Sequence, residues 1–409
     1  MTRSPLEGVV VADFSRVLSG PWCTMTLADL GADVIKVERP GSGDETRGWG
    51  PPFAGGEAAY FLSTNRNKRS VALDLARADH HAVAERLVAR ADVVVENFRP
   101  GTMDRLGLGE EACRRLNPDV IYAAISGFGL DGAARDHPGY DFIIQGLGGV
   151  MSITGEPDRD PMKVGVAIAD ITTGLYCAIG ILAALAERAP AERPPAGDAP
   201  ARVGAGGRHV HVSLLGSQVA WLANQAANHL IGGTEPVRMG NQHPNIVPYQ
   251  VFHAADAPFV LAVANESIWR RFCDVLSLGD LATDPRYATN RDRVQHRDAL
   301  IDRLEVLFAT RARDEWIDAL TPAQVPCGPI NTIAEVFEHP QVRAQGMVER
   351  IEHPTAGEIA LVRTPIELDH ARVTARRAPP TLGQHSAEVL AELGYDEEDI
   401  AALLANPPG

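Results

Sequence analysis

The chain has 409 residues, of which 38 are Lys or Arg and 53 are Asp or Glu, so its formal net charge is −15. An acidic chain of this kind is not expected to bind nucleic acid or an anionic membrane surface. The length and the hydrophobic fraction of 45% exclude a disordered or fibrous protein and allow more than one domain. Any anionic ligand must therefore be held by a local group of basic side chains.

The sequence shows no sign of export, membrane insertion or metal binding. The first residues lack the long apolar region of a secretory signal, and the most apolar later stretch, 175–186, is too short to span a bilayer. Five cysteines lie singly along the chain, which favours neither disulfides nor a zinc site. His209 and His211 share one side of a predicted strand without Cys or carboxylate partners at ligand spacing. We expect a soluble, cytoplasmic protein with no metal site.

β-branched runs alternate with amphipathic stretches over the first 126 residues. The pattern predicts strands and helices in turn at 9–14, 21–30, 34–37, 71–75, 82–91, 93–98, 109–116 and 120–126. Five strands separated by helices are typical of an α/β fold with a Rossmann-like, doubly wound parallel sheet, which binds ligands at the carboxyl ends of its strands. The first turn reads SRVLSGP instead of G-x-G-x-x-G, which disfavours an NAD-dependent dehydrogenase.

The second half of the chain has weaker patterns. An almost wholly apolar stretch from about Asp170 predicts a helix buried on most sides, and residues 189–208, rich in Pro, Ala and Gly, predict a flexible linker. Beyond the linker, a smaller α+β domain is predicted from strands at 209–213 and 259–264 and helices at 215–230, 297–309 and 314–320. Two further helices are predicted at 386–393 and 397–405.

Asp170, where a strand-like run meets the apolar helix, is the position with the clearest chemical interpretation. One interpretation is structural: Asp170 caps the helix by accepting a hydrogen bond from the N–H of Thr172 or Thr173. The other is functional, because a helix N-terminus favours an ionised carboxylate and offers donors to a developing oxyanion. A carboxylate in a dry setting can act as a nucleophile. The residues alone leave both interpretations open.

Several long motifs share one resemblance. They are DFSRVLSGPWCTMTLADLGADVIKVERPGSGDETR (13–47), FLSTNRNKRSVALDL (61–75), VVVENFRPGTMDRLG (93–107), DPRYATNRDRV (284–294), VPCGPIN (325–331) and LGQHSAEVLAELGY (382–395). Together with the stretch around Asp170 they closely resemble the family III (class III) CoA-transferases. That superfamily also contains formyl-CoA transferase, carnitine CoA-transferases and α-methylacyl-CoA racemase. The resemblance covers essentially the whole chain.

The resemblance implies that Asp170 is the nucleophile. Its carboxylate attacks an acyl-CoA thioester to give a mixed anhydride, which the CoA thiolate converts to an aspartyl-CoA thioester. An acceptor carboxylate then takes over the CoA through a second anhydride. Such a relay divides a hard acyl exchange into easier steps. No cofactor is bound permanently, and coenzyme A enters as an acyl-CoA substrate.

By the same resemblance, the CoA site should be formed by loops that follow the first strands. Its implied residues are Val17, Leu18, Ser19, Arg39, Leu73, Asp74, Leu75, Ala76, Asn97, Phe98, Arg99, Arg105 and Tyr140. Other basic side chains of this segment that suit the phosphates of CoA are Arg16, Lys68, Arg69 and Arg77. Residues 1–105 hold 13 Lys and Arg against 14 Asp and Glu, so this segment is nearly neutral within an acidic chain.

Two branches of the superfamily fit the sequence less well. The racemase branch uses the histidine of a G-H-D motif, and here the motif reads Gly139-Tyr140-Asp141. We therefore prefer a transferase, with an acyl-CoA racemase as the alternative and a non-catalytic CoA-binding protein as a second alternative. Oxalate is disfavoured as a substrate, because Leu18 stands where a glutamine is expected and a run of glycines is missing.

Segments 141–157, 238–252 and 335–359 look most like the succinyl-CoA:dicarboxylate branch, which includes succinyl-CoA:glutarate CoA-transferase. We expect succinyl-CoA as the donor and a dicarboxylic acid as the acceptor. Candidates to bind the distal carboxylate of the acceptor are Arg238, Asn241, Gln242 and His243. The alternative for these residues is an ordinary turn around Gly240 and Pro244.

The resemblance also implies an interlocked homodimer in which the N- and C-terminal parts of each chain build one discontinuous large domain. On this basis we predict the N-terminal part of the large domain at 1–188 and a linker with a connecting helix at 189–224. The small domain should cover 225–330. A return linker and the C-terminal part of the large domain should cover 331–409.

Overall fold

The computed structural model describes residues 4–188 and 206–405. Of the linker predicted at 189–208, only the last three residues lie inside the described part. Contacts within the chain define two compact units. Unit 1 contains the described residues of 1–150, 164–224 and 343–409, and unit 2 contains 151–163 and 225–342.

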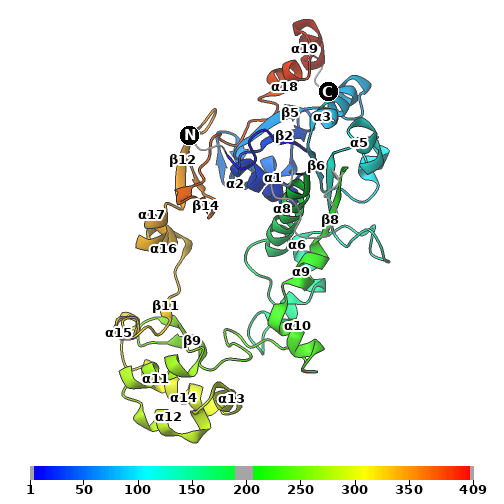
Figure 1. Ribbon diagram of the computed structural model, residues 1–409. Coiled ribbons are helices and arrows are strands. Elements are labelled where there is room, and N and C mark those ends of the chain that lie inside the picture. The colour runs from blue at the N-terminus through cyan, green and yellow to red at the C-terminus, as the bar shows by residue number, and fades with distance from the viewer. Residues whose placement is uncertain (1–3, 189–205, 406–409) are drawn as a thin grey trace, which may run out of the picture. The chain divides into compact units, whose positions relative to one another are not determined.

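Unit 1 is built on a six-stranded parallel sheet (Figure 1). Its strands are β1 (Val10–Asp13), β2 (Asp33–Glu38), β5 (Lys68–Ala72), β6 (Val93–Glu96), β7 (Ile121–Ser126) and β8 (His209–Ser213). They lie in the order β5-β2-β1-β6-β7-β8, with every neighbouring pair parallel. Numbered along the chain, this is the 3-2-1-4-5-6 order of Rossmann sheets, whose ligand crevice lies where the winding reverses. The predicted α/β class is confirmed, and the reversal falls between β1 and β6.

The strand predicted at 209–213 exists, but its assignment to the smaller domain is wrong. It pairs with β7 in parallel, from Tyr122 opposite His209 to Ser126 opposite Ser213, and forms one edge of the main sheet. The Pro- and Gly-rich composition of residues 189–208 suggested a boundary between domains. The chain instead leaves the sheet before this segment and returns to the same sheet after it.

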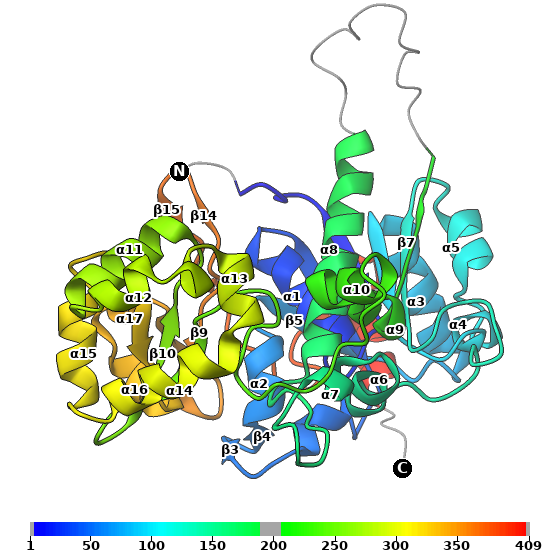
Figure 2. The same cartoon turned by 90° about the horizontal axis from the view of Figure 1, so that it is seen from below.

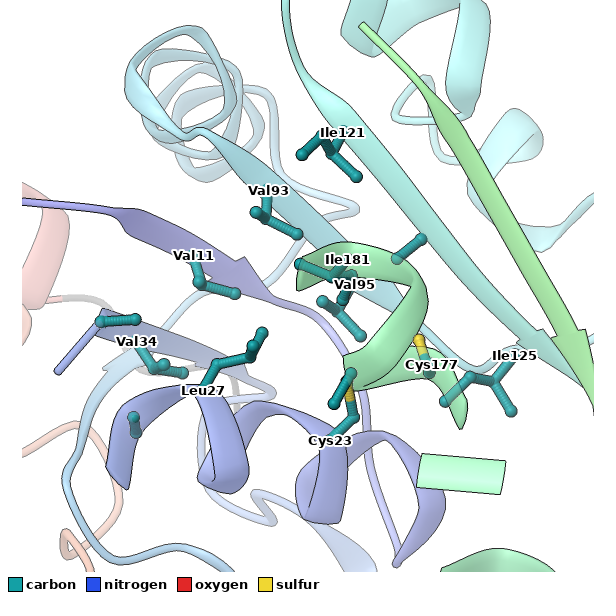
Figure 3. Packing of buried hydrophobic residues seen from close by; sticks show 14 of the residues in the cluster. Val11, Cys23, Leu27, Val34, Val93, Val95, Ile121, Ile125, Cys177 and Ile181 are labelled. Atoms are coloured by element: carbon teal, nitrogen blue, oxygen red, sulfur yellow. The ribbon is translucent and has the colours of Figure 1, made fainter. Parts of the chain in front are cut away.

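Helices cover both faces of this sheet (Figure 1). On one face lie α1 (Ser19–Asp29) and α8 (Ile168–Arg188), and on the other lie α3 (Ala78–Arg90), α5 (Glu110–Leu116) and α18 (Ser386–Glu392). Successive side chains of a strand point to opposite faces, so Val11 belongs to the first core and Ala12 to the second. Figure 3 shows side chains of α1 and α8 packed against the valines and isoleucines of the strands.

Helix α8 corrects the expectation drawn from residues 175–186. The helix has 21 residues and, by its length and composition alone, could cross a membrane. Its buried side chains, among them Cys177 and Ile181, instead pack into the core between α1 and the sheet (Figure 3). The prediction that this stretch is too short to span a bilayer is therefore wrong. The prediction of a helix buried on most sides is also wrong, because seven of its 21 residues are buried and apolar side chains such as Ile179 are exposed.

The helix predicted at 215–230 is interrupted. The structure has α9 (Leu214–Ala220) and α10 (Ala223–Leu230), because Ala223 adopts a left-handed conformation with φ of +46°.

The smaller elements that complete unit 1 and the segment leading into unit 2 are η1 (Glu45–Gly48), β3 (Phe53–Ala54), β4 (Glu57–Ala58), α2 (Ala59–Thr64), α4 (Thr102–Arg105), α6 (Asp141–Leu147), α7 (Val150–Ile153), β12 (Val348–His353), β13 (Gly357–Val362), β14 (Glu367–Leu368), β15 (Ala371–Arg372) and α19 (Glu397–Leu404).

Unit 2 has its own small sheet and its own core. Three antiparallel strands, in the order β11-β10-β9, are surrounded by short helices (Figure 2). Its elements are β9 (Tyr249–His253), β10 (Pro258–Ala262), α11 (Glu266–Val275), α12 (Gly279–Thr283), η2 (Pro285–Tyr287), α13 (Asn290–Gln295), α14 (Arg297–Phe308), α15 (Arg313–Leu320), β11 (Cys327–Pro329), α16 (Ile333–Glu338) and α17 (Pro340–Gln345). Phe308 packs at 5.0 Å, ring centre to ring centre, against both Phe252 and Phe259. These contacts are typical of an independent hydrophobic core.

The packing of α8 on α1 requires a glycine. A Cβ atom on Gly174 would lie 2.5 Å from the carbonyl oxygen of Ser19 and 3.1 Å from Cβ of Trp22. Only the missing side chain therefore allows α8 to approach the first turn of α1 so closely.

We expect Gly174→Ala to lower the free energy of unfolding by about 1–3 kcal/mol, because α1 and α8 must separate to admit the methyl group. Denaturant unfolding followed by far-UV circular dichroism measures the loss. Gly165→Ala is the matched control, because a Cβ atom there meets open space. Equal stability of the two variants would contradict the close contact.

Candidate active site

The loop that follows β1 is fixed in an unusual conformation at the reversal point of the sheet. Val17 has φ of +68°, which a β-branched residue rarely adopts. Its N–H donates to the Asp44 carboxylate at 3.2 Å. Next to it, the Asn97 side chain accepts from the N–H of Arg16 at 2.9 Å and donates to the Arg16 carbonyl at 2.7 Å. A residue that follows β6 thus holds the loop that follows β1.

Buried ions lie beneath this loop. Lys36 Nζ donates to the Ser15 carbonyl at 2.8 Å and to Asp44 Oδ2 at 2.9 Å, and Lys68 Nζ donates to Asp13 Oδ2 at 3.2 Å. Burial raises the pKa of Asp44, but Lys36 and hydrogen bonds from Thr46 outweigh it and bring this pKa to about 2. Burial lowers the pKa of Lys68 to about 8. Buried, paired charges therefore lie directly beneath the loop that follows β1.

This network removes basic side chains from the set suggested for CoA. Lys68 is fully buried in its contact with Asp13. Arg69 is paired with Asp33, Glu388 and Glu392. Arg77 is paired with Asp79 in its own segment. Lys68 and Arg69 act inside the fold, which the sequence pattern did not indicate.

Asp170 lies in the first turn of α8, two residues after the helix begins, so the interpretation of Asp170 as the helix cap is wrong. Asp141 from α6 takes that place. Its Oδ1 accepts from the N–H of Ala169 at 2.8 Å and from the N–H of Asp170 at 3.4 Å. Because Gly174 follows Asp170 by one helical turn, its contact with α1 brings the Asp170 carboxylate to the hydroxyl of Ser19.

The surroundings of Asp170 favour its neutral form. Burial raises its pKa and the charge of Asp141 raises it further, while a hydrogen bond from Ser19 lowers it. The net result is a pKa of about 7, against an ordinary value of 3.8. A carboxyl group that ionises near neutral pH in a cavity is typical of a functional site.

Two cavities meet at this edge of the sheet. The smaller, of about 180 Å³, is lined by Asp170, Arg16, Val17, Ser19, Glu45, Trp49, Asn97, Arg99, Ile125, Ser126, Gly127, Pro138, Gly139, Tyr140 and Leu214. The larger, of about 490 Å³, is lined mainly by residues that follow β1, β2 and β5, among them Arg39, Leu73, Asp74, Leu75, Ala76 and Phe98. Arg16 and Glu45, which form an ion pair, line both. The cavities therefore share a wall at the carboxyl ends of the strands, where this sheet type binds ligands.

The structure thus brings together most of the residues implied for CoA. Two do not line either cavity: Leu18 is buried, and Arg105 is exposed and donates to Thr102 Oγ1 at 2.9 Å. Tyr140 lines the smaller cavity with 59% of its side-chain surface exposed, and Phe98 packs under the guanidinium of Arg16 at 5.2 Å.

The four residues suggested for the acceptor lie in one loop of unit 2. The Arg238 guanidinium donates to the carbonyls of Glu156, Pro157 and Arg159 at 3.0–3.2 Å, which ties the loop to the segment after α7. Gln242 closes a turn onto Met239, and the ring of His243 lies 5.1 Å from that of Tyr249. Asn241 lies in the same turn, next to Gly240.

Sequence reasoning missed several residues of the site. Trp49 lines the smaller cavity and contacts the ring of Tyr60 edge-on at 5.3 Å. Burial and the charge of Asp170 raise the pKa of Tyr60 to about 12. Gly127 and Gly139 cross so closely that a Cβ atom on Gly139 would lie 2.5 Å from Cα of Gly127. The G-Y-D motif drew attention to Gly139, but its partner is evident only in three dimensions.

The two histidines considered as metal ligands have other partners. His209 Nδ1 lies 3.0 Å from Glu110 Oε2, and His211 Nε2 lies 3.0 Å from Ser126 Oγ. Within residues 4–188 and 206–405, no three side chains of His, Cys, Asp or Glu are placed to hold a metal ion.

We expect Asp170→Asn to stabilise the protein at alkaline pH and not at acidic pH. The native state binds the Asp170 proton more tightly than the unfolded chain does. The contribution of this proton to the free energy of unfolding is therefore complete below pH 3.8 and is lost as the pH rises through about 7. Three pKa units correspond to at most about 4 kcal/mol. Thermal unfolding of both proteins between pH 5 and 9 measures the difference. A difference independent of pH over this range would contradict the shifted pKa.

The comparisons with known proteins agree with this site. The family described as CoA-transferase family III matches residues 6–386. The chain is 46% identical to succinate–glutarate CoA-transferase of Agrobacterium fabrum over 96% of both chains. It is 40% identical to human succinyl-CoA:glutarate CoA-transferase over 98% of this chain and 89% of the human protein.

A solved structure agrees as well. The crystal structure of a CaiB/BaiF family protein from Brucella suis is 44% identical to the chain, with a TM-score of 0.81, over 96% of this chain and all of that one. Together with the α/β fold and the cavity at the reversal point of the sheet, these matches show that the chain belongs to CoA-transferase family III and is an enzyme that transfers coenzyme A from an acyl-CoA substrate.

Proposed function

We propose that this enzyme transfers CoA from succinyl-CoA to a dicarboxylic acid such as glutarate, with Asp170 as the nucleophile. The observation that carries the proposal is the half-buried Asp170 carboxylate in the smaller cavity, next to a larger cavity with room for the nucleotide part of CoA. The two similar proteins named for succinate or succinyl-CoA and glutarate support the choice of substrates. Location in the cytoplasm stays a prediction.

The first half of the reaction loads CoA onto the protein. An ionised Asp170 oxygen attacks the thioester carbon of succinyl-CoA, the C–S bond breaks, and CoA leaves as a thiolate. The thiolate then attacks the Asp170 carbonyl carbon of the resulting anhydride. Succinate leaves, and Asp170 carries CoA as a thioester.

The second half repeats these steps with the acceptor. A glutarate carboxylate attacks the Asp170 thioester, and the thiolate returns to attack the glutaryl carbon of the second anhydride. Glutaryl-CoA leaves and the Asp170 carboxylate is restored, so atoms and charge balance without an added proton or cofactor. A dry cavity limits hydrolysis of both anhydrides.

Three features of unit 1 support this scheme. Ser19 holds a hydrogen bond to Asp170 and so favours the ionised, attacking form. Arg39, exposed beside the larger cavity, offers a cation to the phosphates of CoA. Tyr140 stands where the racemase motif has its histidine, so racemisation loses one of its two bases and is disfavoured. For the distal carboxylate of the acceptor, we retain Arg238, Asn241, Gln242 and His243 as the proposed binding loop.

We expect Asp170→Ala to lower kcat for glutaryl-CoA formation from succinyl-CoA and glutarate by ~10³-fold or more, because the covalent relay is lost. Liquid chromatography of the CoA esters measures the rate. Asp119→Asn, an exposed change ahead of β7, is the control and should retain activity.

In the unaltered protein, kcat/KM should fall as the pH drops below about 7, because Asp170 becomes protonated. Unchanged turnover by Asp170→Ala would refute the proposed mechanism. Failure of the unaltered protein to form glutaryl-CoA would end the choice of acceptor.

We further propose that the enzyme is a homodimer. Large apolar side chains of α6 and α8 are exposed, with Leu147 at 66%, Ile179 at 61% and Phe142 at 58%. An apolar cavity of about 750 Å³ in unit 1 is lined by Leu175 of α8 together with residues such as Trp22. Exposed apolar surface of this kind marks an interaction site. A second copy of the chain is the occupant that the family resemblance implies.

Light scattering coupled to size-exclusion chromatography should give a mass of twice 43.8 kDa for the unaltered protein. Ile179→Asp places a charge on the exposed face of α8, so we expect this variant to dissociate at concentrations where the unaltered protein remains dimeric. Val306→Asp, at a residue of unit 2 that is 74% exposed, is the control. A monomeric unaltered protein would refute the proposal.

A further inference from the structure

A second carboxylate stands next to Asp170, and the reaction scheme above assigns it no role. Asp141, the first residue of α6, accepts from the N–H groups of Ala169 and Asp170 at 2.8 and 3.4 Å through Oδ1. Its Oδ2 accepts from Nε2 of Gln145 at 2.6 Å. The backbone of the nucleophile is therefore tied directly to a charged side chain of another helix.

Gln145 holds Asp141 in this orientation. Its side chain is fully buried, and its Oε1 accepts from the N–H of Val164 at 2.8 Å. Since Oε1 is occupied in this way, the amide nitrogen must point at Asp141. The carboxylate of Asp141 is thus bound on both oxygens and cannot turn away from α8 without losing a buried hydrogen bond.

The charge of Asp141 opposes the ionisation of Asp170. The N-terminus of α8 and the Ser19 hydroxyl favour the charged form of Asp170, and burial opposes it. The other ionisable groups around the Asp170 cavity are Tyr60 from α2, Arg16 from the loop after β1, Glu45 from η1, Arg99 from the loop after β6 and Tyr140 just before α6. Asp141 is the charged group that contacts the backbone of Asp170 directly.

We propose that Asp141 is a positioning residue for CoA transfer, which fixes the first turn of α8 and places a second carboxylate beside the nucleophile. The charge of Asp141 raises the pKa of Asp170. The inference rests on the proposed function, because it assigns Asp170 the role of nucleophile. A more basic carboxylate is a stronger nucleophile once it is ionised, and a group that ionises near neutral pH is ionised in a large fraction of the molecules at working pH. Asp141 therefore gives the nucleophile reactivity without preventing its ionisation.

Asp141→Asn tests the effect of charge, because it keeps the size of the side chain and an oxygen that can accept the two N–H groups. We expect the acid limb of the kcat/KM profile for succinyl-CoA to move to lower pH by roughly one unit. We also expect kcat above this limb to fall several-fold, because the nucleophile becomes less basic. Asp119→Asn removes the same charge from an exposed position ahead of β7 and should leave the limb in place.

The side-chain amide introduced by Asp141→Asn would face the amide nitrogen of Gln145, so this single change can loosen the fold. The double variant Asp141→Asn with Gln145→Glu restores an acceptor to the introduced amide and to the N–H of Val164, and it places the negative charge one side chain farther away. Its acid limb should lie between those of the unaltered protein and of Asp141→Asn. A purely structural role predicts lower stability and an unchanged limb in both variants, and that result would overturn the proposal.

A measurement without turnover separates this inference from the proposed function. The effect of Asp170→Asn on stability is followed against pH, once in the unaltered protein and once in a protein that already carries Asp141→Asn. The pH at which this effect changes should be lower in the Asp141→Asn background. The same pH in both backgrounds would overturn the inference even in an active enzyme. A shift in a protein that forms no glutaryl-CoA would support the coupling of the two carboxylates and refute glutarate as the acceptor.

Discussion

The structure of the site depends on one constraint: the carboxylate of Asp170 lies half-buried next to a second carboxylate at the start of α8. Burial and the charge of Asp141 both oppose its ionisation, while Ser19 and the helix N-terminus favour it. The resulting pKa of Asp170 lies near neutral pH. A small displacement of α1 or α6 would change this balance, because the interaction energies of charges depend steeply on distance inside a protein. The surrounding packing therefore has to be close and rigid.

That rigidity comes from the contacts of glycines and from buried ions. Gly174 lets α8 touch the first turn of α1, and Gly127 and Gly139 let two loops cross behind the cavity. Lys36 and Asp44 pair beneath the loop after β1 and hold Val17 in a conformation that the free chain would avoid. Buried ion pairs contribute little net stability, but breaking one leaves an unpaired charge, so the loop has a single well-defined arrangement. The two cavities beside Asp170 are bounded by this loop.

The sequence allowed most of the main sheet to be predicted and marked Asp170 as the candidate nucleophile, and the reasons for the misses are physical. Strands buried on both faces have long β-branched runs, so β1, β2, β6 and β7 were recognisable from local pattern alone. Strand β8 was also recognised, but pairing between strands far apart in sequence leaves no local signal, and its sheet was assigned wrongly. The break at Ala223 falls in a residue that normally favours helix, so only tertiary packing accounts for it.

Some residues of the site could likewise be predicted from the sequence, and others could not. Asp170 was recognised because it lies at a junction between two patterns and within a family motif. Asp141 acts across 29 residues of sequence, and nothing in its own surroundings marks it as the cap of α8. Lys68 and Arg69 resemble surface cations in the sequence, and their internal partners come from β1, β2 and α18. Charge partners that lie far apart in the chain are evident only after folding.

The central claim is that Asp170 forms an anhydride with both acids, and oxygen labelling tests it directly. In the proposed second half-reaction, one carboxylate oxygen of the acceptor becomes the bridge of the anhydride and stays on Asp170 when glutaryl-CoA leaves. A single turnover with unlabelled succinyl-CoA and glutarate labelled with oxygen-18 in its carboxylates should therefore place one labelled oxygen on the peptide that contains Asp170, as measured by mass spectrometry. Formation of labelled glutaryl-CoA with no label on that peptide would contradict the account.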